Sequence, residues 1–180
     1  KMSQNDGVRT ALLRLCSLGK NLLLEEPAEL RDAALDFGLE TEDELITVED
    51  LAVLAAECLR RAREFDGEVD FDDMIWLPVV LGMRPETFSH VLVDETQDLN
   101  RAQLELAQRA CRTDGRIVAV GDDRQAIYRF RGADKEAVGR VVRELSAKTL
   151  PLSITYRCPR AVVALAQRVV PDLEAAPNAE

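Results

Sequence analysis

The sequence predicts an α/β fold in which a mostly helical N-terminal region precedes a parallel β-sheet. Up to about Gly82 apolar residues recur at helical spacing, whereas after Arg84 and Pro85 short apolar runs alternate with amphipathic segments. With 180 residues and 47% hydrophobic content, the chain can bury a core in one domain, or in one domain and part of another.

The clearest predicted helix begins after Thr47, because Thr47 and Asp50 have the spacing of an N-terminal capping box. The apolar residues that follow are spaced to form one buried stripe: Leu51, Leu54, Ala55, Cys58, Leu59 and Ala62. A second segment, residues 70–82, is rich in large apolar side chains. We expect these to pack in the core rather than to stack on a ligand: Phe71, Met74, Ile75, Trp76, Leu77 and Leu81.

The second half of the chain predicts two buried strands, HVLVDE (90–95) and RIVAVGD (116–122), and a third strand, LPLSITYR (150–157). Two predicted helices separate them, at 100–112 with Asn100 and Gln103 placed to cap it, and at 134–148. The apolar face of the latter is formed by Val138, Val141, Val142 and Leu145. Such alternation indicates a parallel sheet covered on both sides, in which ligands bind at the carboxyl ends of the strands. Those ends are DETQD, GDDRQ and TYRCP.

The net charge of −10 argues at first sight against nucleic-acid binding, because phosphate binding depends on Lys and Arg. The acidity is confined to residues 25–73, which carry 18 acidic and 4 basic side chains, so the rest of the chain is net positive. We interpret this acidic segment as a solvated helical surface, with a docking face for a protein partner as the alternative.

The four scattered cysteines suggest neither a metal site nor a disulfide framework, so we expect reduced thiols, mostly in the core. The sequence has no secretion signal at its start and no apolar run of about 18 residues. A soluble cytoplasmic protein is therefore expected.

The DETQD segment has the residue types that phosphoanhydride hydrolysis requires. Asp94 and Glu95 follow an expected strand, where alternating side chains point in different directions. One carboxylate can then hold Mg²⁺ while the other orients or deprotonates a water molecule. Taken alone, these acids are a weak signal, and a helix cap or an ion pair is the more common explanation.

The segment VGDDRQAIYRFRGA (120–133) adds an amide, Gln125, that can hydrogen-bond a terminal phosphate or the water next to it. It also interleaves aromatic and basic side chains, Tyr128, Phe130 and Arg131 among them, a composition that suits single-stranded nucleic acid. The third strand ends in Tyr156 and Arg157, a ring that could stack on a purine and a cation that could reach a γ-phosphate.

The ordered set VDETQD, VGDDRQAIYRFRGA and LSITYRCP resembles motifs II, III and IV of the UvrD/Rep family of superfamily 1 DNA helicases. DFDDM lies upstream, where that family has a similar segment. The resemblance covers about half of the chain, residues 70–160. It implies an ATP- and Mg²⁺-dependent helicase that moves 3′ to 5′ on single-stranded DNA and opens duplex junctions, built on a RecA-like parallel sheet of the P-loop NTPase type.

The resemblance also implies roles for individual residues. Asp94 would bind Mg²⁺ and Glu95 would activate water, with Gln97 and Asp98 in a supporting network. Gln125 would sense the γ-phosphate, Tyr156 would stack on adenine and Arg157 would contact the γ-phosphate. The residues implied to contact DNA are Tyr128, Phe130, where many members have Trp, and Arg131, which either touches the DNA backbone or ties the motif together.

The sequence departs from that family in lacking the phosphate loop G-x-x-x-x-G-K-[ST]. Gly19-Lys20 has Arg14 where the first Gly should be and Asn21 where the hydroxyl should be, so we interpret it as unrelated to phosphate binding. Motifs V and VI are also absent. We therefore expect an internal fragment, inactive by itself, with a helical insertion of the first lobe (1–88), part of that lobe (89–149) and the start of a second lobe (150–180).

Two alternatives remain. In a polymerase or nuclease, GDD and DETQD would supply a two-metal cluster, although the polymerase motif continues directly into an antiparallel strand. In a non-catalytic helicase relic, the chain would act as a protein- or DNA-binding module, which fits the missing phosphate loop.

Overall fold

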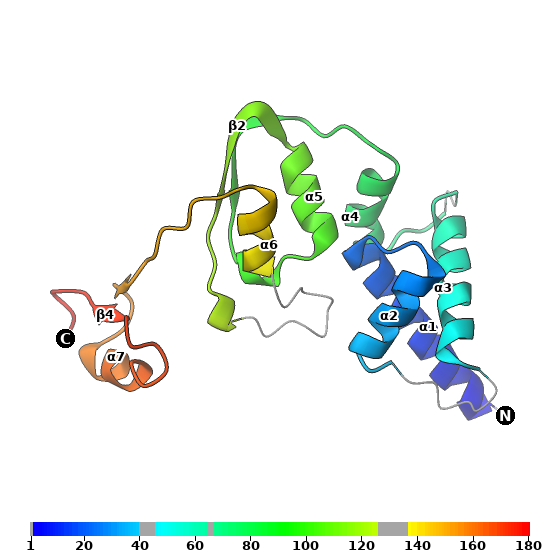
Figure 1. The fold of residues 1–180 in the computed structure, drawn as a ribbon, viewed down its shortest axis with the longest axis horizontal. Coiled ribbons are helices and arrows are strands. Elements are labelled where there is room, and N and C mark those ends of the chain that lie inside the picture. Colours follow the sequence, from blue (N-terminus) through cyan, green and yellow to red (C-terminus); the bar gives the residue numbers. More distant parts are fainter. Residues whose placement is uncertain (1, 40–45, 65–66, 126–136) are drawn as a thin grey trace. The chain divides into compact units, whose positions relative to one another are not determined.

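The computed structural model describes residues 2–39, 46–64, 67–125 and 137–180. It has a mixed α/β fold with small parallel sheets, as the sequence predicts. The chain divides into two compact units, residues 1–144 and residues 145–180, which Figure 1 shows in sequence colours.

The described N-terminal part of the first unit is helical, with α1 (Met2–Leu22), α2 (Pro27–Asp36), α3 (Val48–Ala62) and α4 (Phe71–Val80). Helices α1, α2 and α3 lie side by side (Figure 1), and their small and leucine side chains form the main hydrophobic core together with Trp76 of α4. Among the residues described, the largest fully buried side chains are those of Trp76, Leu15, Leu30 and Leu51. The predicted burial of Trp76 is confirmed.

Helix α3 begins as predicted, since the Thr47 hydroxyl accepts the backbone N–H of Asp50 at 3.1 Å. The predicted stripe is partly wrong, because Leu54 and Cys58 are exposed. The buried face instead joins Ala52 to Leu51, Ala55 and Leu59. Helices α1 and α2 both pack on α3.

Helix α4 has two apolar faces, and only one of them is buried. Trp76 and Val79 point into the core, whereas Phe71, Met74 and Leu81 are 89%, 61% and 53% exposed. The expectation that all the large apolar residues of this segment are in the core is therefore wrong. The exposed three lie at positions i, i+3 and i+10, the helix face opposite Trp76.

The sheet of the first unit consists of β1 (Phe88–Val93) and β2 (Cys111–Ala119), joined through helix α5 (Arg101–Arg109). The two strands are parallel, with His90 opposite Arg116 and Val93 opposite Ala119. The strand β2 starts five residues earlier than expected, with an irregular stretch around Gly115, where an added Cβ would meet Ser89 O at 3.0 Å.

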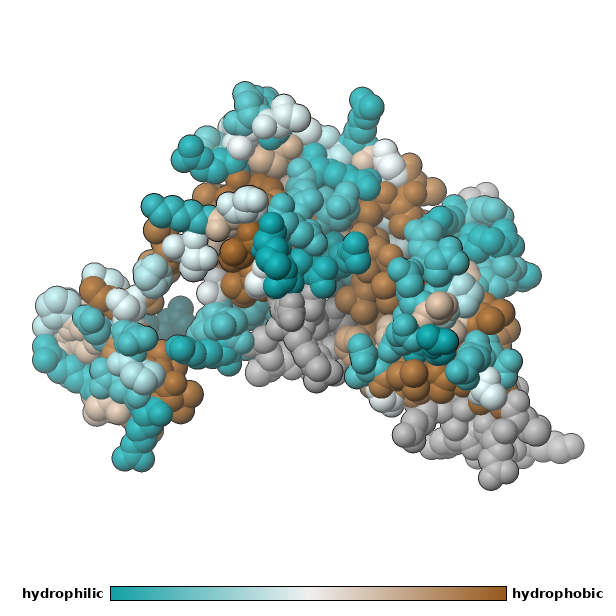
Figure 2. Space-filling model, in the orientation of Figure 1, coloured by the Kyte–Doolittle hydropathy of each residue, from teal (hydrophilic) through white to brown (hydrophobic). Residues whose placement is uncertain are grey.

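The prediction that these strands are buried is wrong. Leu92 is 77% exposed, and Val118 and Val120 are also exposed. A sheet of two strands has an unpaired edge on each side, and the expected third strand lies in the other unit. Figure 2 shows hydrophobic side chains reaching the surface of both units.

The described residues of this unit also form the short helices η1 (Thr96–Asp98), η2 (Asp123–Gln125) and α6 (Ala137–Glu144). Helix α6 covers the described part of the helix predicted at 134–148 and buries Val141. Its contacts include η1, so it packs beside the end of β1.

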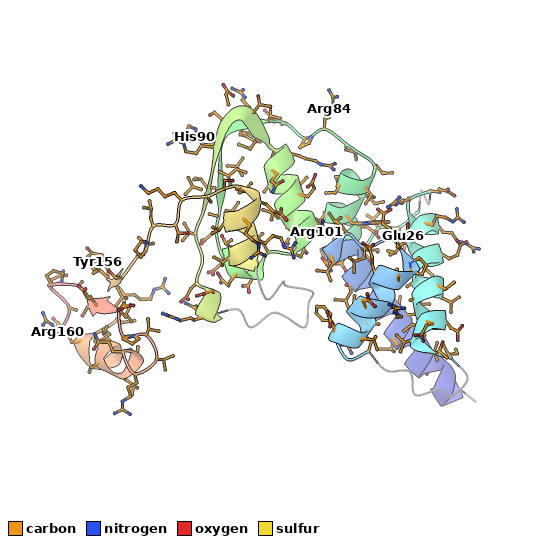
Figure 3. The ribbon with its side chains drawn as sticks, in the orientation of Figure 1. Glu26, Arg84, His90, Arg101, Tyr156 and Arg160 are labelled. Atoms are coloured by element: carbon orange, nitrogen blue, oxygen red, sulfur yellow. The ribbon has the colours of Figure 1, made fainter. Side chains whose placement is uncertain are left out.

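The second unit contains β3 (Ile154–Thr155), α7 (Arg160–Ala166) and β4 (Glu174–Ala175). Strand β3 has two residues rather than the eight predicted, because its parallel partner β4 is equally short. The Arg160 side chain, labelled in Figure 3, donates to the carbonyls of Pro177 and Ala179 and fastens the last residues to α7.

The four cysteines are free, as expected, but none of them is fully buried. Cys16 packs against the hydrophobic core, whereas Cys58 is exposed, so the prediction that the thiols lie mostly in the core is only partly right. Burial nevertheless raises the pKa of the Cys16 thiol to about 12, with a smaller contribution from Cys58. Within the described ranges, no helix is both long enough and apolar enough to span a membrane.

Candidate functional site

The carboxyl ends of β1 and β2 lie side by side and are joined by a chain of side-chain hydrogen bonds. The amide Nε2 of Gln97 donates to Glu95 Oε2 at 2.7 Å, and its Oε1 accepts the backbone N–H of Asp122 at 2.9 Å. Asp122 Oδ2 in turn accepts Gln125 Nε2 at 2.8 Å. Gln97 and Asp122 thus connect Glu95 to Gln125, which are two of the predicted site residues.

Asp94 and Glu95 follow strand β1 and are not part of it, contrary to the sequence prediction. Strand β1 ends at Val93, so strand alternation does not apply to them. Glu95 instead adopts a left-handed backbone conformation, with φ of 51° and ψ of 46°. That conformation costs a side-chain-bearing residue about 1–2 kcal/mol. It turns Glu95 towards Gln97, while both carboxylates remain exposed.

Backbone contacts hold the two strand ends together on either side of Gln97. Thr96 donates both its N–H and its hydroxyl to Val120 O, at 2.9 and 2.8 Å. Gly121 follows, and a Cβ atom there would lie 2.7 Å from Gln97 Oε1 and 2.9 Å from Thr96 N. The close approach therefore requires glycine at position 121. No signal in the sequence pointed to the contacts of Thr96 or to the acceptor role of Asp122.

The DETQD segment is also tied to the helical region. Asn100 caps α5 by accepting the Gln103 N–H at 2.8 Å, as predicted, and donates to Asn21 Oδ1 of α1 at 2.6 Å. The contact with Asn21 has no signal in the sequence, because the two residues are 79 positions apart. Asp98 differs from its neighbours: its Oδ1 is buried and has no hydrogen-bond partner among the described residues.

The Gly-Lys pair at positions 19 and 20 is part of helix α1, not of a loop. Gly19 lies where an added Cβ would meet Leu59 and Leu30 at 2.6 and 3.0 Å. Lys20 is 2.8 Å from Asp70 and 2.9 Å from Asp73. Burial alone would lower the pKa of Lys20, but its hydrogen bonds to these carboxylates raise it. The pair therefore has a packing and ion-pairing role in the helical region.

The acidic segment, residues 25–73, uses several of its carboxylates internally. Arg60 and Arg61 both bind Glu57 and lower its pKa to about 2. Arg63 pairs with Glu25. These pairs favour the interpretation of the segment as a solvated helical surface.

The predicted residues of the third strand lie in the second unit. Tyr156, labelled in Figure 3, is 79% exposed, and its neighbour Arg157 is also exposed. Both line an open hollow of about 530 Å³ together with Leu152, Ile154, Thr155 and Leu173. Its lining combines apolar side chains with the ring of Tyr156 and the cation of Arg157.

The predicted DNA-contacting residues Tyr128, Phe130 and Arg131 lie outside the described residues. The GDDRQ segment that leads to them is described as far as Gln125.

Comparison with known proteins identifies the family. Residues 18–145 match the model of the UvrD/REP helicase N-terminal domain, which covers more than half of the chain and includes both connected strand ends. The chain belongs to the UvrD/Rep helicase family.

Individual curated relatives agree with this assignment. The chain is 36% identical over 80 residues to DNA helicase II of Haemophilus influenzae, and the aligned region covers 44% of this chain and 11% of that protein. It is 37% identical over 98 residues to the ATP-dependent DNA helicase Rep of Escherichia coli, covering 49% and 15%. It is 32% identical over 123 residues to the putative ATP-dependent DNA helicase YjcD of Bacillus subtilis, covering 63% and 16%. The chain thus spans less than a fifth of the length of each of these relatives.

The structure around the GDD segment disfavours the polymerase alternative. The strand before GDD is parallel to its neighbour, and the segment continues into the helical turn η2. Asp122 accepts the Arg124 N–H and the Gln125 amide, so hydrogen bonds to neighbouring residues use both its carboxylate oxygens. In the described part of the chain, no group of three His, Cys, Asp or Glu residues could hold a metal ion.

Proposed function

We propose that this chain is part of an ATP-dependent DNA helicase of the UvrD type. The full-length protein would couple ATP hydrolysis to 3′-to-5′ movement on single-stranded DNA and to opening of duplex junctions. The 180-residue chain by itself would neither hydrolyse ATP nor unwind DNA, because it lacks the phosphate-loop pattern. The relatives named as ATP-dependent DNA helicases support the proposal.

The observation that supports it best is the hydrogen-bonded link between Glu95 and Gln125. A base that activates water and an amide that senses the γ-phosphate must act on the same few atoms. Two strand ends joined in this way can supply both groups to one nucleotide. The position also fits the rule that ligands of parallel sheets bind at the carboxyl ends of the strands.

The residues present fit one Mg²⁺ site of the kind found in nucleotide hydrolases. Mg²⁺ takes one or two carboxylates together with phosphate oxygens and waters, so a cluster of three acids is not needed. Asp94 accepts the Glu95 N–H through Oδ1 at 2.9 Å, which fixes its orientation. Its Oδ2 accepts no hydrogen bond from the described residues and can face the ion. Bound Mg²⁺ would neutralise charge that develops on the phosphates.

The second unit would supply the remaining nucleotide contacts. Tyr156 would stack on adenine, and Arg157 would contact the γ-phosphate, as the hollow lined by both residues allows. Tyr128, Phe130 and Arg131 would contact single-stranded DNA through stacking and backbone contacts.

The exposed apolar residues of the sheet support a larger, RecA-like lobe. Leu92, Val118 and Val120 are exposed, and each strand has one edge without a partner strand among the described residues. The buried, unpaired Asp98 Oδ1 likewise requires a donor. Further strands of a P-loop NTPase lobe would satisfy both. Residues 1–88 would then be a helical insertion of that lobe, 89–149 part of the lobe itself, and 150–180 the start of a second lobe.

The test is ATP turnover by the full-length protein encoded by the open reading frame around this segment. We expect hydrolysis stimulated by single-stranded DNA, and a loss of at least about 100-fold in Glu95→Gln, since general-base catalysis contributes about 10²–10⁴-fold. The matched control is Glu64→Gln, an exposed carboxylate of the helical region, which should be fully active.

Two outcomes would contradict the proposal. Full activity of Glu95→Gln would exclude the assigned base. An open reading frame without a phosphate loop, and no turnover, would favour the non-catalytic relic, for which protein binding by the acidic segment 25–73 would then be the activity to measure.

A further inference from the structure

Gln97 is almost completely buried, at 3% exposure, and both ends of its side-chain amide are used. Its Nε2 donates to Glu95 and its Oε1 accepts from the Asp122 backbone. Among the side chains of this length, a neutral amide alone offers a donor at one end and an acceptor at the other. Glutamate would present a second negative charge to Glu95, and methionine would offer neither bond.

The surroundings leave Gln97 little freedom to move. Thr96 is fixed to Val120 O by two hydrogen bonds, and Val120 N–H is fixed to Val93 O at 2.8 Å. Gly121 lies against the Gln97 carbonyl so closely that no side chain fits there. The amide therefore lies in a slot between the two strand ends, and its hydrogen bonds hold one orientation of the Glu95 carboxylate.

The link continues on the far side of Asp122. Its Oδ2 accepts the Gln125 amide, and its backbone carbonyl accepts the Gln125 N–H at 3.0 Å. If Gln125 turns towards a phosphate, it releases Asp122, whose backbone N–H remains bound to Gln97. The orientation of Glu95 and the position of the Gln125 loop are thus joined through one side chain.

We propose that Gln97 is a positioning residue that orients Glu95 and couples it to Gln125 during ATP hydrolysis. The inference rests on the proposed function of this site. Gln97 touches neither nucleotide nor water in this role and acts only through its two partners. Its bond to the charged Glu95 is of the strong, charge-assisted kind.

Kinetics of the full-length protein with saturating single-stranded DNA test the coupling. Gln97→Ala should lower kcat for ATP about 10- to 100-fold, the worth of a hydrogen bond to a charged group, with KM for ATP within about twofold. Gln125→Ala should also lower kcat. The kcat of the double variant should equal that of the less active single variant, because both substitutions break the same link. The matched control, Gln108→Ala on α5, should keep full activity; its amide makes only a 3.4 Å contact with Glu144.

Gln97→Glu separates positioning from structure. Its carboxylate keeps an acceptor for the Asp122 N–H but loses the donor to Glu95. Hydrogen exchange of the Asp122 amide in the 180-residue chain should therefore stay slow in Gln97→Glu and become faster in Gln97→Ala. Both variants should nevertheless lose kcat.

Each remaining outcome has one meaning. If kcat stays within twofold in Gln97→Ala, or if the losses of the two single variants multiply, the inference is wrong while the proposed function stands. If the Asp122 amide exchanges equally fast in the unsubstituted chain and in Gln97→Ala, the hydrogen bond from the Asp122 N–H to Gln97 is refuted, and the positioning role with it. If the unsubstituted full-length protein does not hydrolyse ATP, the proposed function fails, and the inference fails with it.

Discussion

Replacing Lys20 by methionine should destabilise the protein strongly. Lys20 and Asp73 have side chains that are only 10% and 12% exposed, and their charged atoms are 2.9 Å apart. Removing one partner of such a buried pair typically costs about 3–5 kcal/mol, because the other charge stays buried without compensation. Asp70, also bound to Lys20, is 60% exposed and can be hydrated, so we expect the lower end, about 3 kcal/mol.

Methionine keeps the apolar stem of Lys20 beside Trp76 and removes only the charge, so lost packing would not explain the effect. The ammonium group is 6.0 Å from the centre of the Trp76 ring. Trp76 is the only tryptophan of the chain, and its fluorescence during urea unfolding reports on this region directly. Lys148→Met, which removes an exposed charge, is the matched control.

A second substitution tests the cause. Adding Asp73→Asn to Lys20→Met should restore stability to within about 1 kcal/mol, because replacing both charges of a buried pair is close to neutral. If Lys20→Met unfolds at the same urea concentration as the unsubstituted protein, the ion pair does not stabilise the helical region. A loss of nucleotide binding without loss of stability would instead make Lys20 a phosphate ligand.

Three further predictions concern other parts of the chain. Glu95→Gly should be more stable than Glu95→Ala by about 1 kcal/mol in urea unfolding, since glycine tolerates the left-handed conformation; equal stabilities would contradict the strain at this position. Gly121→Ala should lower the free energy of unfolding by about 1–3 kcal/mol and speed exchange of the Asp122 amide, whereas an unchanged exchange rate would refute the close approach. The pKa values of Lys20 and Cys16 are both raised in the folded state, from ordinary values of 10.5 and 9.0. Each group therefore contributes its full stabilisation below its ordinary pKa, and this stabilisation is lost as the pH rises through its pKa in the folded protein. Urea midpoints should therefore fall steadily from pH 9 to pH 12, and alkylation of Cys16 at pH 8 should be much slower than that of Cys58; equal alkylation rates would contradict the burial of Cys16.

Local sequence signals predicted the parts of the fold that depend on neighbouring residues. The caps at Thr47 and Asn100 were predictable because a capping box involves residues three positions apart. The parallel pairing of β1 and β2 follows from the helix between them. Which apolar face is buried was not predictable for Phe71 or Leu92, since burial depends on the number of layers that cover an element.

In the candidate site too, the sequence predicted the residue types but not the contacts between distant residues. The residue types of DETQD and GDDRQ pointed to Glu95 and Gln125 without any structure. Their connection through Gln97 and the Asp122 backbone depends on a left-handed residue and on a glycine turn 26 positions away from it, which no periodic pattern encodes. The ion pair of Lys20 with Asp73 was hidden for the same reason: it joins helices about 50 residues apart.

The most direct test of the account is a crystal structure of the full-length protein with Mg²⁺ and a non-hydrolysable ATP analogue. We predict the γ-phosphate at the joined ends of β1 and β2, with Asp94 on Mg²⁺ at about 2.0–2.1 Å or through one water, and Glu95 still bound to Gln97. A nucleotide bound elsewhere, with Asp94, Glu95 and Gln125 facing away from its phosphates, would contradict the central claim.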